Sequence, residues 1–367
     1  MFHLKGKIKS LGAFFLLAPL SLNSTRLKAK TCSFYIKKSA SLSGAITSKT
    51  WHLWDNWLLW DNRIPNLLHR FAMAAPKNVP VPLIDEKARW IHFTSPDGGK
   101  TWKEAGVILL ADAKNAERAV WSGSIRQNAK GEFWAAYTSL IGKRKTMQGI
   151  GLAFWSDSKK KLIQLPKLLL DPRRDFEALK QKGYAMEDFE NLGKGLERDN
   201  TVMALRDPYI YGDDPKQAKV YFAAKAQNSD GSFSPAIGRF TINKTSSGYE
   251  AILEEPLRVP DEKKFKQVEL PNVFDVAGQK YLLISTTNRL SQEQSDLDSD
   301  LHSRLYSFNE NGELEALGRL KGFDIELYGA QVSWPEPNLL SSFFHRDASQ
   351  PRQLSLPRVR RFRNKNK

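Results

Sequence analysis

From about residue 85 onward the chain consists of short β-type segments separated by turn sequences, and this limits its fold more than any other feature. Seven segments mix polar with apolar or aromatic residues, as half-buried strands do: ARWIHFTS, GEFWAAYTSL, GIGLAFWS, AKVYFAAKA, SPAIGRFTI, QKYLLISTT and SRLYSFNENGEL. The turns between them, such as SPDGGK, NAKGE and NSDGS, are rich in Gly, Asn and Asp. Many short strands without alternating helices indicate an all-β sandwich, barrel or propeller.

The length of the chain favours the propeller among these three. Of the 367 residues, about 300 divide naturally into a few four-stranded blades. No regular internal repeat accompanies the strands, so the prediction depends on strand pattern and length. Helical periodicity is confined to about residues 173–196, which we interpret as an insertion between strands.

The charge of the chain is concentrated at its two ends. The sequence has 56 Lys and Arg against 40 Asp and Glu, a net charge of +16. Residues 1–50 hold nine basic and no acidic residues, residues 352–367 hold seven and none, and the remaining 40 basic residues balance the 40 acidic ones. A neutral body has no broad face for phosphates, so no nucleic-acid partner is expected. We predict one folded unit, residues 51–351, with both basic tails disordered outside it.

The N-terminal segment has the arrangement of a secretory signal. Lys5, Lys7 and Lys9 precede an apolar run over residues 11–22. A run of roughly 12 apolar residues is shorter than the ~20 that span a bilayer, so stable membrane insertion is not expected. The segment predicts a secreted, periplasmic or envelope location. Its acid-free, Ser-rich continuation to Lys49 leaves an organelle transit peptide as the alternative.

Metal and disulfide chemistry have little support in the sequence. Cys32 is the single cysteine, which excludes an intramolecular disulfide and a cysteine-based zinc site. The six histidines are scattered and form no HExxH pair. We expect neither a metal nor a cofactor, and we expect a monomer.

One turn has a specific signature. SPDGGKTW, residues 95–102, fits the Asp-box pattern Ser-x-Asp-x-Gly-x-Thr-Trp, in which Asp97 caps a Gly-rich turn and Trp102 packs beneath it. Such boxes are structural elements on the propeller blades of sialidases. A sialidase would also need an arginine cluster and a tyrosine nucleophile, which the sequence does not identify.

Three carboxylates lie in polar and aromatic surroundings that suit glycoside chemistry. Most glycosidases place two carboxyl groups about the scissile bond, with further groups that hold the sugar. Asp55 lies in HLWDNWLLWDNR, Asp207 in LRDPYIY and Glu269 in QVELPNVF. Each also has a structural interpretation, since Asp-Pro opens turns and Glu269 is compatible with an exposed strand position. Their order along the chain is a stronger signal than any one of them.

Four short motifs, taken in order, carry a family resemblance: WDNW at 54–57, WSGS at 121–124, RDP at 206–208 and ELPNVF at 269–274. Together with FAMAAP after the first motif, they resemble the landmarks of the levansucrase and inulosucrase family, glycoside hydrolase family 68, over about residues 51–346. The resemblance implies a five-bladed propeller related to invertases. It also implies a fructosyl-transferring enzyme that acts on sucrose or fructans.

The resemblance assigns the catalytic roles residue by residue. It implies that Asp55 is the nucleophile, Asp207 the transition-state stabiliser and Glu269 the general acid/base, and that Asp61 only flanks the site. The nucleophile must be ionised and the acid protonated, so their surroundings must push the two pKa values apart. A carboxylate near Arg206 or hydroxyl donors would stay charged, and one against apolar walls near another carboxylate would keep its proton. A retaining mechanism predicts that the Asp55 and Glu269 carboxyl groups lie about 5 to 5.5 Å apart.

The resemblance also implies a set of sugar-binding residues: Trp54, Trp121, Ser122, Arg206, Gln267, Tyr328 and Arg346. The two tryptophans would form apolar walls, Ser122 would hydrogen-bond near the nucleophile, and Arg206 would contact sugar hydroxyls. Tyr328 and Arg346 match the family's pocket more loosely.

The chain departs from the family pattern beside the general acid. The family usually has an acidic residue two positions before it and an arginine just after it; here these are Gln267 and Leu270. A further arginine is displaced from Thr287 to Arg289. These positions shape the leaving-group and acceptor side, so the donor sugar and polymer formation are left open.

Three functions therefore compete. The leading hypothesis is a retaining β-fructosyl enzyme that hydrolyses or transfers from sucrose or a related fructoside. The second keeps the fold and changes the sugar, as in an invertase or an arabinan-type hydrolase. The third, motivated by Gln267 and Leu270, is a catalytically weak carbohydrate-binding propeller.

Overall fold

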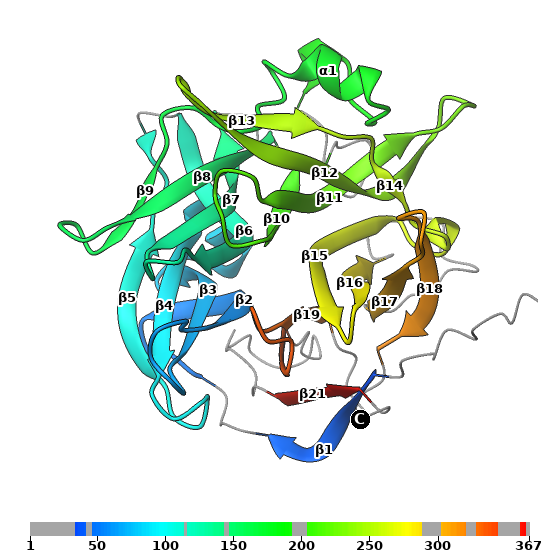
Figure 1. Ribbon diagram of the computed structural model, residues 1–367. Helices are drawn as coiled ribbons and strands as arrows, with labels where there is room; N and C mark the ends of the chain where they lie inside the picture. Colours follow the sequence, from blue (N-terminus) through cyan, green and yellow to red (C-terminus); the bar gives the residue numbers. More distant parts are fainter. Residues whose placement is uncertain are drawn as a thin grey trace, which may run out of the picture.

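The strands of the protein surround a central axis in a computed structural model (Figure 1). The structure describes residues 34–41, 46–113, 116–142, 147–192, 204–287, 302–320, 328–343 and 360–364. Nearly all regular structure in these ranges is antiparallel β-sheet. The predicted all-β propeller is confirmed.

Four sheets are each made of strands that follow one another in sequence. The first contains β2 (Trp51–Trp60), β3 (Leu68–Pro76), β4 (Arg89–Ser95) and β5 (Lys103–Leu109). The second contains β6 (Glu117–Gln127), β7 (Phe133–Ile141), β8 (Gln148–Ser156) and β9 (Lys161–Gln164). The third contains β10 (Arg206–Tyr211), β11 (Lys219–Gln227), β12 (Phe233–Thr245) and β13 (Gly248–Leu253), with β14 (Leu257–Arg258) paired to β12. The fourth contains β15 (Gln267–Val276), β16 (Gln279–Thr287), β17 (His302–Phe308) and β18 (Leu314–Arg319).

A further sheet joins the two ends of the chain. Its order is β1 (Phe34–Ser41), β21 (Arg360–Asn364), β20 (Leu339–Phe343) and β19 (Tyr328–Val332). Two expectations are corrected here. The chain has four blades of consecutive strands rather than five, and both basic tails, expected to be disordered, contribute a strand to this composite sheet. Basic composition does not prevent this, because a strand needs only backbone donors and acceptors. Residues 1–33 of the leader, Cys32 included, and residues 42–45 lie outside the described residues.

One edge strand of each sheet faces the axis. Strands β2, β6, β10, β15 and β19 contact one another in this order, and β19 contacts β2. The sheets therefore pack face to face, and both faces of many strands are buried. Strand β7 is buried at eight of its nine positions, which is why FWAAYTSLI lacks a strict polar and apolar alternation.

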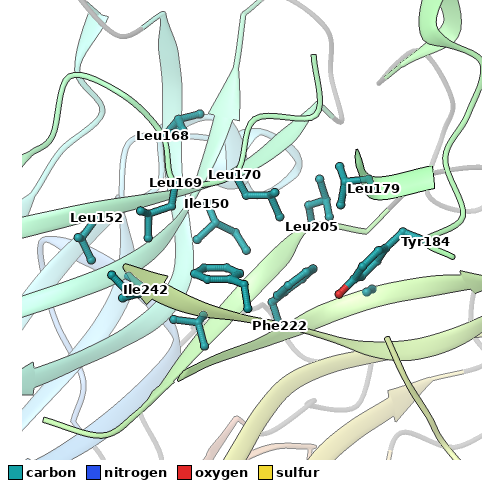
Figure 2. Packing of buried hydrophobic residues seen from close by; sticks show 14 of the residues in the cluster. Ile150, Leu152, Leu168, Leu169, Leu170, Leu179, Tyr184, Leu205, Phe222 and Ile242 are labelled. Atoms are coloured by element: carbon teal, nitrogen blue, oxygen red, sulfur yellow. The ribbon is translucent and has the colours of Figure 1, made fainter. Parts of the chain in front are cut away.

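Apolar cores fill the spaces between neighbouring sheets. Figure 2 shows the core between the second and third sheets, where Ile150 and Leu152 of β8 face Phe222 of β11 and Ile242 of β12. Each fully buried side chain of this kind stabilises the fold by about 1.5–3 kcal/mol. The blades are thus held in fixed positions around the axis.

The described helices are short and lie between strands. They are η1 (Val81–Lys87), α1 (Phe176–Gln181), η3 (Phe189–Asn191) and η5 (Glu262–Lys264). Helix α1 occupies the insertion predicted between strands, and its Leu179 packs into the core of Figure 2. No helix in the described ranges is long and apolar enough to cross a membrane.

The Asp-box turn connects β4 and β5. Asp97 Oδ1 accepts the hydroxyl of Ser95 at 2.7 Å and the backbone N–H groups of Lys100 and Thr101 at 3.0 and 2.9 Å. Trp102 packs against the core beside Leu68. The turn therefore serves to close a hairpin, as the sequence predicts.

Candidate active site

The strands around the axis share one irregularity. Their pairing shifts between Leu53 and Asn56, Trp121 and Gly123, Arg206 and Tyr209, and Glu269 and Asn272. Bulges re-aim side chains and are common beside active sites. Each of these four contains or adjoins a polar residue singled out from the sequence: Asp55, Ser122, Asp207 or Glu269.

Local backbone geometry explains parts of the motifs. A Cβ on Gly123 of WSGS would lie 2.2 Å from the carbonyl oxygen of Ala136, so only glycine fits this bulge. Asp207 and Leu270 have positive φ angles of 56° and 52°, a strained conformation for residues with a side chain. Such strain gathers at functional sites.

A pocket of about 180 Å³ lies at the level of the bulges. Its lining residues are Trp54, Asp55, Met73, Asp85, Trp121, Ser122, Arg206, Asp207 and Glu269. Seven of the ten residues predicted for the site are among them. They come from four sheets. The first and last of the three predicted catalytic carboxylates, Asp55 and Glu269, are more than 200 residues apart in sequence.

Asp55 is a carboxyl group largely removed from water. The hydroxyl of Ser122 donates a short hydrogen bond to its Oδ2. Burial raises the pKa of Asp55 to about 7, the Ser122 hydrogen bond opposes that rise, and the negative charges of Glu269 and Asp85 add to it. Asp55 therefore loses its proton only near neutral pH.

Arg206 pairs with Glu269 rather than with Asp55. Its Nη2 lies 3.1 Å from Glu269 Oε1 and 3.2 Å from Gln267 Oε1, and its Nε lies 3.8 Å from Asp207 Oδ2. The arginine is 4% exposed, so these contacts are poorly screened by solvent. The sequence predicted an ionised nucleophile and a protonated acid. Instead, the predicted nucleophile, Asp55, has the raised pKa, and the predicted acid, Glu269, is paired with the arginine.

Thr138 connects Ser122 and Asp207 through their backbone groups. Its hydroxyl donates to the carbonyl oxygen of Ser122 at 2.8 Å and accepts the N–H of Asp207 at 2.7 Å. The N–H of Leu270 in turn donates to Asp207 Oδ2 at 3.2 Å. These bonds fix Asp207 between the second and fourth sheets.

Sequence reasoning missed three residues of this site: Thr138, Met73 and Asp85. Asp85 reaches the pocket from η1, and its carbonyl oxygen accepts the indole N–H of Trp121 at 2.8 Å. FAMAAP contains Met73, but no motif marks the other two. Their positions follow from β-sheet pairing and loop path, which a local pattern does not encode.

Three predicted residues do not line the pocket. Gln267 is buried behind it and accepts a hydrogen bond from Arg206. Tyr328 begins β19 and is buried. Arg346 lies outside the described residues, as does Arg289. Within the described ranges no three His, Cys, Asp or Glu side chains are grouped as metal ligands would be.

Comparison with protein families finds one match that covers most of the chain. The family described as "Glycosyl hydrolases family 32 N-terminal domain" matches residues 77–314. The matched range includes Asp207 and Glu269 and begins after Asp55. The motif resemblance pointed to family 68, whereas the matching family is 32. Comparison with curated proteins finds no match.

Solved structures with the same fold include levansucrases and an inulosucrase. A Bacillus subtilis levansucrase variant in complex with oligosaccharides is 15% identical, with a TM-score of 0.59, 87% of this chain and 85% of that chain covered. An inulosucrase from Halalkalicoccus jeotgali bound to kestose is 17% identical, with a TM-score of 0.57 and 84% and 82% covered. A levansucrase variant complexed with sucrose is 16% identical, with a TM-score of 0.60 and 85% and 83% covered. At such identities the matches establish the fold alone.

Proposed function

Because the chain belongs to the family of the glycosyl hydrolases family 32 N-terminal domain, we propose that it is a retaining β-fructosyl-transferring glycosidase that acts on sucrose or a related fructoside. One observation carries the proposal: Asp55, Asp207, Glu269 and Arg206, which come from three sheets, line a single pocket. Most retaining glycosidases cleave the bond with two carboxyl groups, one as nucleophile and one as general acid/base, and here a third lies beside them.

In the first step Asp55 attacks the anomeric carbon of the fructosyl unit. The glycosidic bond breaks, and its electron pair goes to the leaving oxygen, which takes the proton of Glu269. A covalent fructosyl ester on Asp55 results. Asp207 accepts hydrogen bonds from sugar hydroxyls and stabilises the positive charge that develops on the ring.

In the second step an oxygen nucleophile releases the sugar. Glu269, now a carboxylate, removes a proton from water or from a hydroxyl of a second sugar, and that oxygen attacks the anomeric carbon. The bond to Asp55 breaks and its carboxylate is restored. Water gives hydrolysis and a sugar gives transfer.

The proton cycle requires an ionised Asp55 and a protonated Glu269, whereas the raised pKa of Asp55 favours its protonated form below about pH 7. The charge of Glu269 adds to the raised pKa of Asp55, so the two carboxyl groups act on each other electrostatically. Catalysis needs one proton on the pair, located on Glu269 when the bond breaks. Arg206, hydrogen-bonded to Glu269 and Gln267, positions the acid toward the leaving group.

The pocket is sized for one sugar ring. Its volume of about 180 Å³ is below the ~300–1,000 Å³ of sites that enclose drug-sized ligands. Trp54 and Trp121 supply apolar surface for the ring. The remainder of a disaccharide would therefore extend past the pocket mouth.

The wider organisation follows the same proposal. The composite sheet completes the ring of strands around the axis, because β19 contacts both β15 and β2. Residues 51–351 then form the single catalytic unit, to which both tails add a strand. The basic and apolar N-terminal segment supports export to the envelope or the medium.

Incubation with sucrose, raffinose, inulin and, in a separate arm, arabinan, followed by chromatography of the products, tests the proposal. Release of fructose or of fructosylated products from any of them supports it. Turnover of arabinan alone would favour the related hydrolase. Binding without turnover of any sugar would favour the carbohydrate-binding propeller.

A further inference from the structure

A second depression, larger than the catalytic pocket, lies on the third sheet. It has a volume of about 740 Å³. Its lining comes from residues within 228–235, the β11–β12 turn with the start of β12, and from residues within 258–266, the end of β14 and the segment that follows it. We call it the rim cleft. Figure 1 shows β14 between the β11–β12 pair and β15.

The rim cleft lies at the same end of the sheet as the catalytic pocket. Arg206, the first residue of β10, pairs with Ala223, and β11 continues past this position to Gln227 before it turns. Lys266 of the cleft directly precedes Gln267, which accepts a hydrogen bond from Arg206. From Lys266 to Glu269 an extended chain covers about 10 Å. The two sites are therefore neighbours along one rim.

The rim cleft presents an aromatic ring to solvent. Phe233, the first residue of β12, is 39% exposed, and the ammonium group of Lys225 lies 4.9 Å from its ring centre. Ser232 and Asn228 line the same cleft. An exposed ring beside hydroxyl and amide groups matches a sugar, which has apolar C–H faces and hydroxyl edges.

The charges of the cleft favour a neutral ligand over an anion. Arg258, Lys263 and Lys266 are opposed by Asp230 and Glu262. Arg258 is also engaged, since its guanidinium donates to Gln227 O and Asn228 Oδ1. A phosphate site would require several hydrogen-bond donors that converge on one point. A mixture of donors and acceptors can instead bind hydroxyl groups, which both donate and accept hydrogen bonds.

We propose that the rim cleft binds further units of a neutral oligosaccharide whose terminal fructosyl unit occupies the catalytic pocket. The inference rests on the proposed function. It explains why a pocket of one-ring size adjoins a cleft about four times larger. The enzyme should therefore prefer oligosaccharide chains over disaccharides, because only a chain is long enough for its distal units to reach the rim cleft.

Replacing Phe233 with alanine tests the inference. Phe233→Ala should lower kcat/KM for inulin about tenfold, the loss of one good contact, and should leave kcat/KM for sucrose within about twofold. Phe189→Ala is the matched control, because Phe189 is 53% exposed on η3 in the insertion, outside the cleft. It should change neither value.

Equal losses on sucrose and inulin, or no loss on either, would overturn the inference while leaving the fructosidase assignment in place. If the wild-type enzyme turns over neither sugar, the proposed function fails, and titration calorimetry with inulin oligosaccharides decides the cleft alone. Binding that Phe233→Ala weakens supports it. Binding that the variant leaves unchanged, or that inorganic phosphate displaces, refutes it.

Discussion

Asp55 lies in the middle of β2 and Asp61 directly follows its last residue, Trp60. The surroundings of the two aspartates differ in the number of hydrogen-bond donors. Of the donors identified, Asp55 receives one from a side chain, that of Ser122. Asp61 receives four: the backbone N–H groups of Arg63 and Ile64 at 2.8 and 2.7 Å, Gln127 Nε2 at 2.8 Å and His69 Nε2 at 3.1 Å.

The pKa values of the two groups consequently move in opposite directions. Burial raises the pKa of Asp55 to about 7 because one hydrogen bond does not compensate for lost water. Burial acts on Asp61 in the same sense, but the hydrogen bonds from Gln127, Arg63, His69 and Ile64 outweigh it and lower the pKa to about 2. Asp61, whose carboxylate accepts four hydrogen bonds, stabilises a turn. Asp55, whose carboxylate accepts one from a side chain, remains available to react.

The largest expected difference between the two aspartates is in catalysis. Asp55→Asn should lower kcat on sucrose by at least about 10³-fold, because the nearly isosteric amide cannot attack as an anion. No fructosyl adduct should appear on the variant by mass spectrometry after rapid quenching. Asp61→Asn should retain most of the activity.

The same pair of variants checks the assignment. If Asp55→Asn still turned over sucrose and Asp61→Asn did not, the nucleophile would be misassigned and the motifs misaligned.

The thermal stability of Asp55→Asn shows whether the variant is folded. A raised pKa in the folded state means that stability falls as pH rises from 3.8 through about 7. Asp55→Asn should therefore melt at or above the wild-type temperature at pH 8.

The pH dependence of the rate is the second test. Since Asp55 must be ionised to attack, kcat/KM should fall about tenfold for each pH unit below the pKa of about 7. Asp61→Asn should leave this midpoint unchanged, because Asp61 is already ionised far below it. A midpoint near 4 in initial-rate measurements would show that Asp55 is not desolvated in the working enzyme.

For the free energy of unfolding, in contrast to catalysis, the larger loss is expected from replacing Asp61. The Asp61 side chain is 3% exposed, and Asn offers a single acceptor oxygen where Asp offers two. Asp61→Asn should lower the free energy of unfolding by about 1–3 kcal/mol at pH 7. A lowered pKa means that the stabilisation is complete above 3.8 and disappears as pH falls toward 2.

Urea unfolding at pH 7 measures that loss. Gln127→Glu is a useful second variant, because it replaces the donor to Asp61 Oδ2 with a second carboxylate. It should destabilise the protein more at pH 7 than at pH 4. Equal urea midpoints for wild type and Asp61→Asn would remove the structural role of this residue.

The strand content of the fold was predictable because turn residues and β-type segments are local signals. ARWIHFTS became β4, and QKYLLISTT became β16. The strand made from residues 34–41 was not predictable, since β1 pairs with β21 from the opposite end of the chain. A partner more than 300 residues away leaves no local pattern, and basic side chains suggested solvent.

The sequence predicted the pocket residues that lie in recognisable motifs and missed the others. WDNW, WSGS and RDP contributed Asp55, Ser122 and Arg206, because bulges and tight backbone packing require particular residues there. The partner of Arg206 was not predictable from the same motifs. Whether the guanidinium pairs with Glu269 or with Asp55 depends on how three blades meet, which is a property of tertiary packing.

The smallest expected effect concerns the one side-chain donor that Asp55 receives. Ser122→Ala removes the hydrogen bond that opposes the raised pKa of Asp55. A hydrogen bond worth about 0.5–1.5 kcal/mol corresponds to roughly 0.4–1.1 pKa units, so the midpoint of kcat/KM against pH should move upward by about that amount. Ser124→Ala is the matched control on the same strand. Its hydroxyl bonds Pro208 O and the N–H of Ile210 at 2.9 and 2.7 Å, so its loss should lower stability and leave the midpoint in place. If the midpoint moved in Ser124→Ala and not in Ser122→Ala, the protonation of Asp55 would depend on how β6 and β10 pack together rather than on its own donor, and the contrast with Asp61 would lose its physical basis.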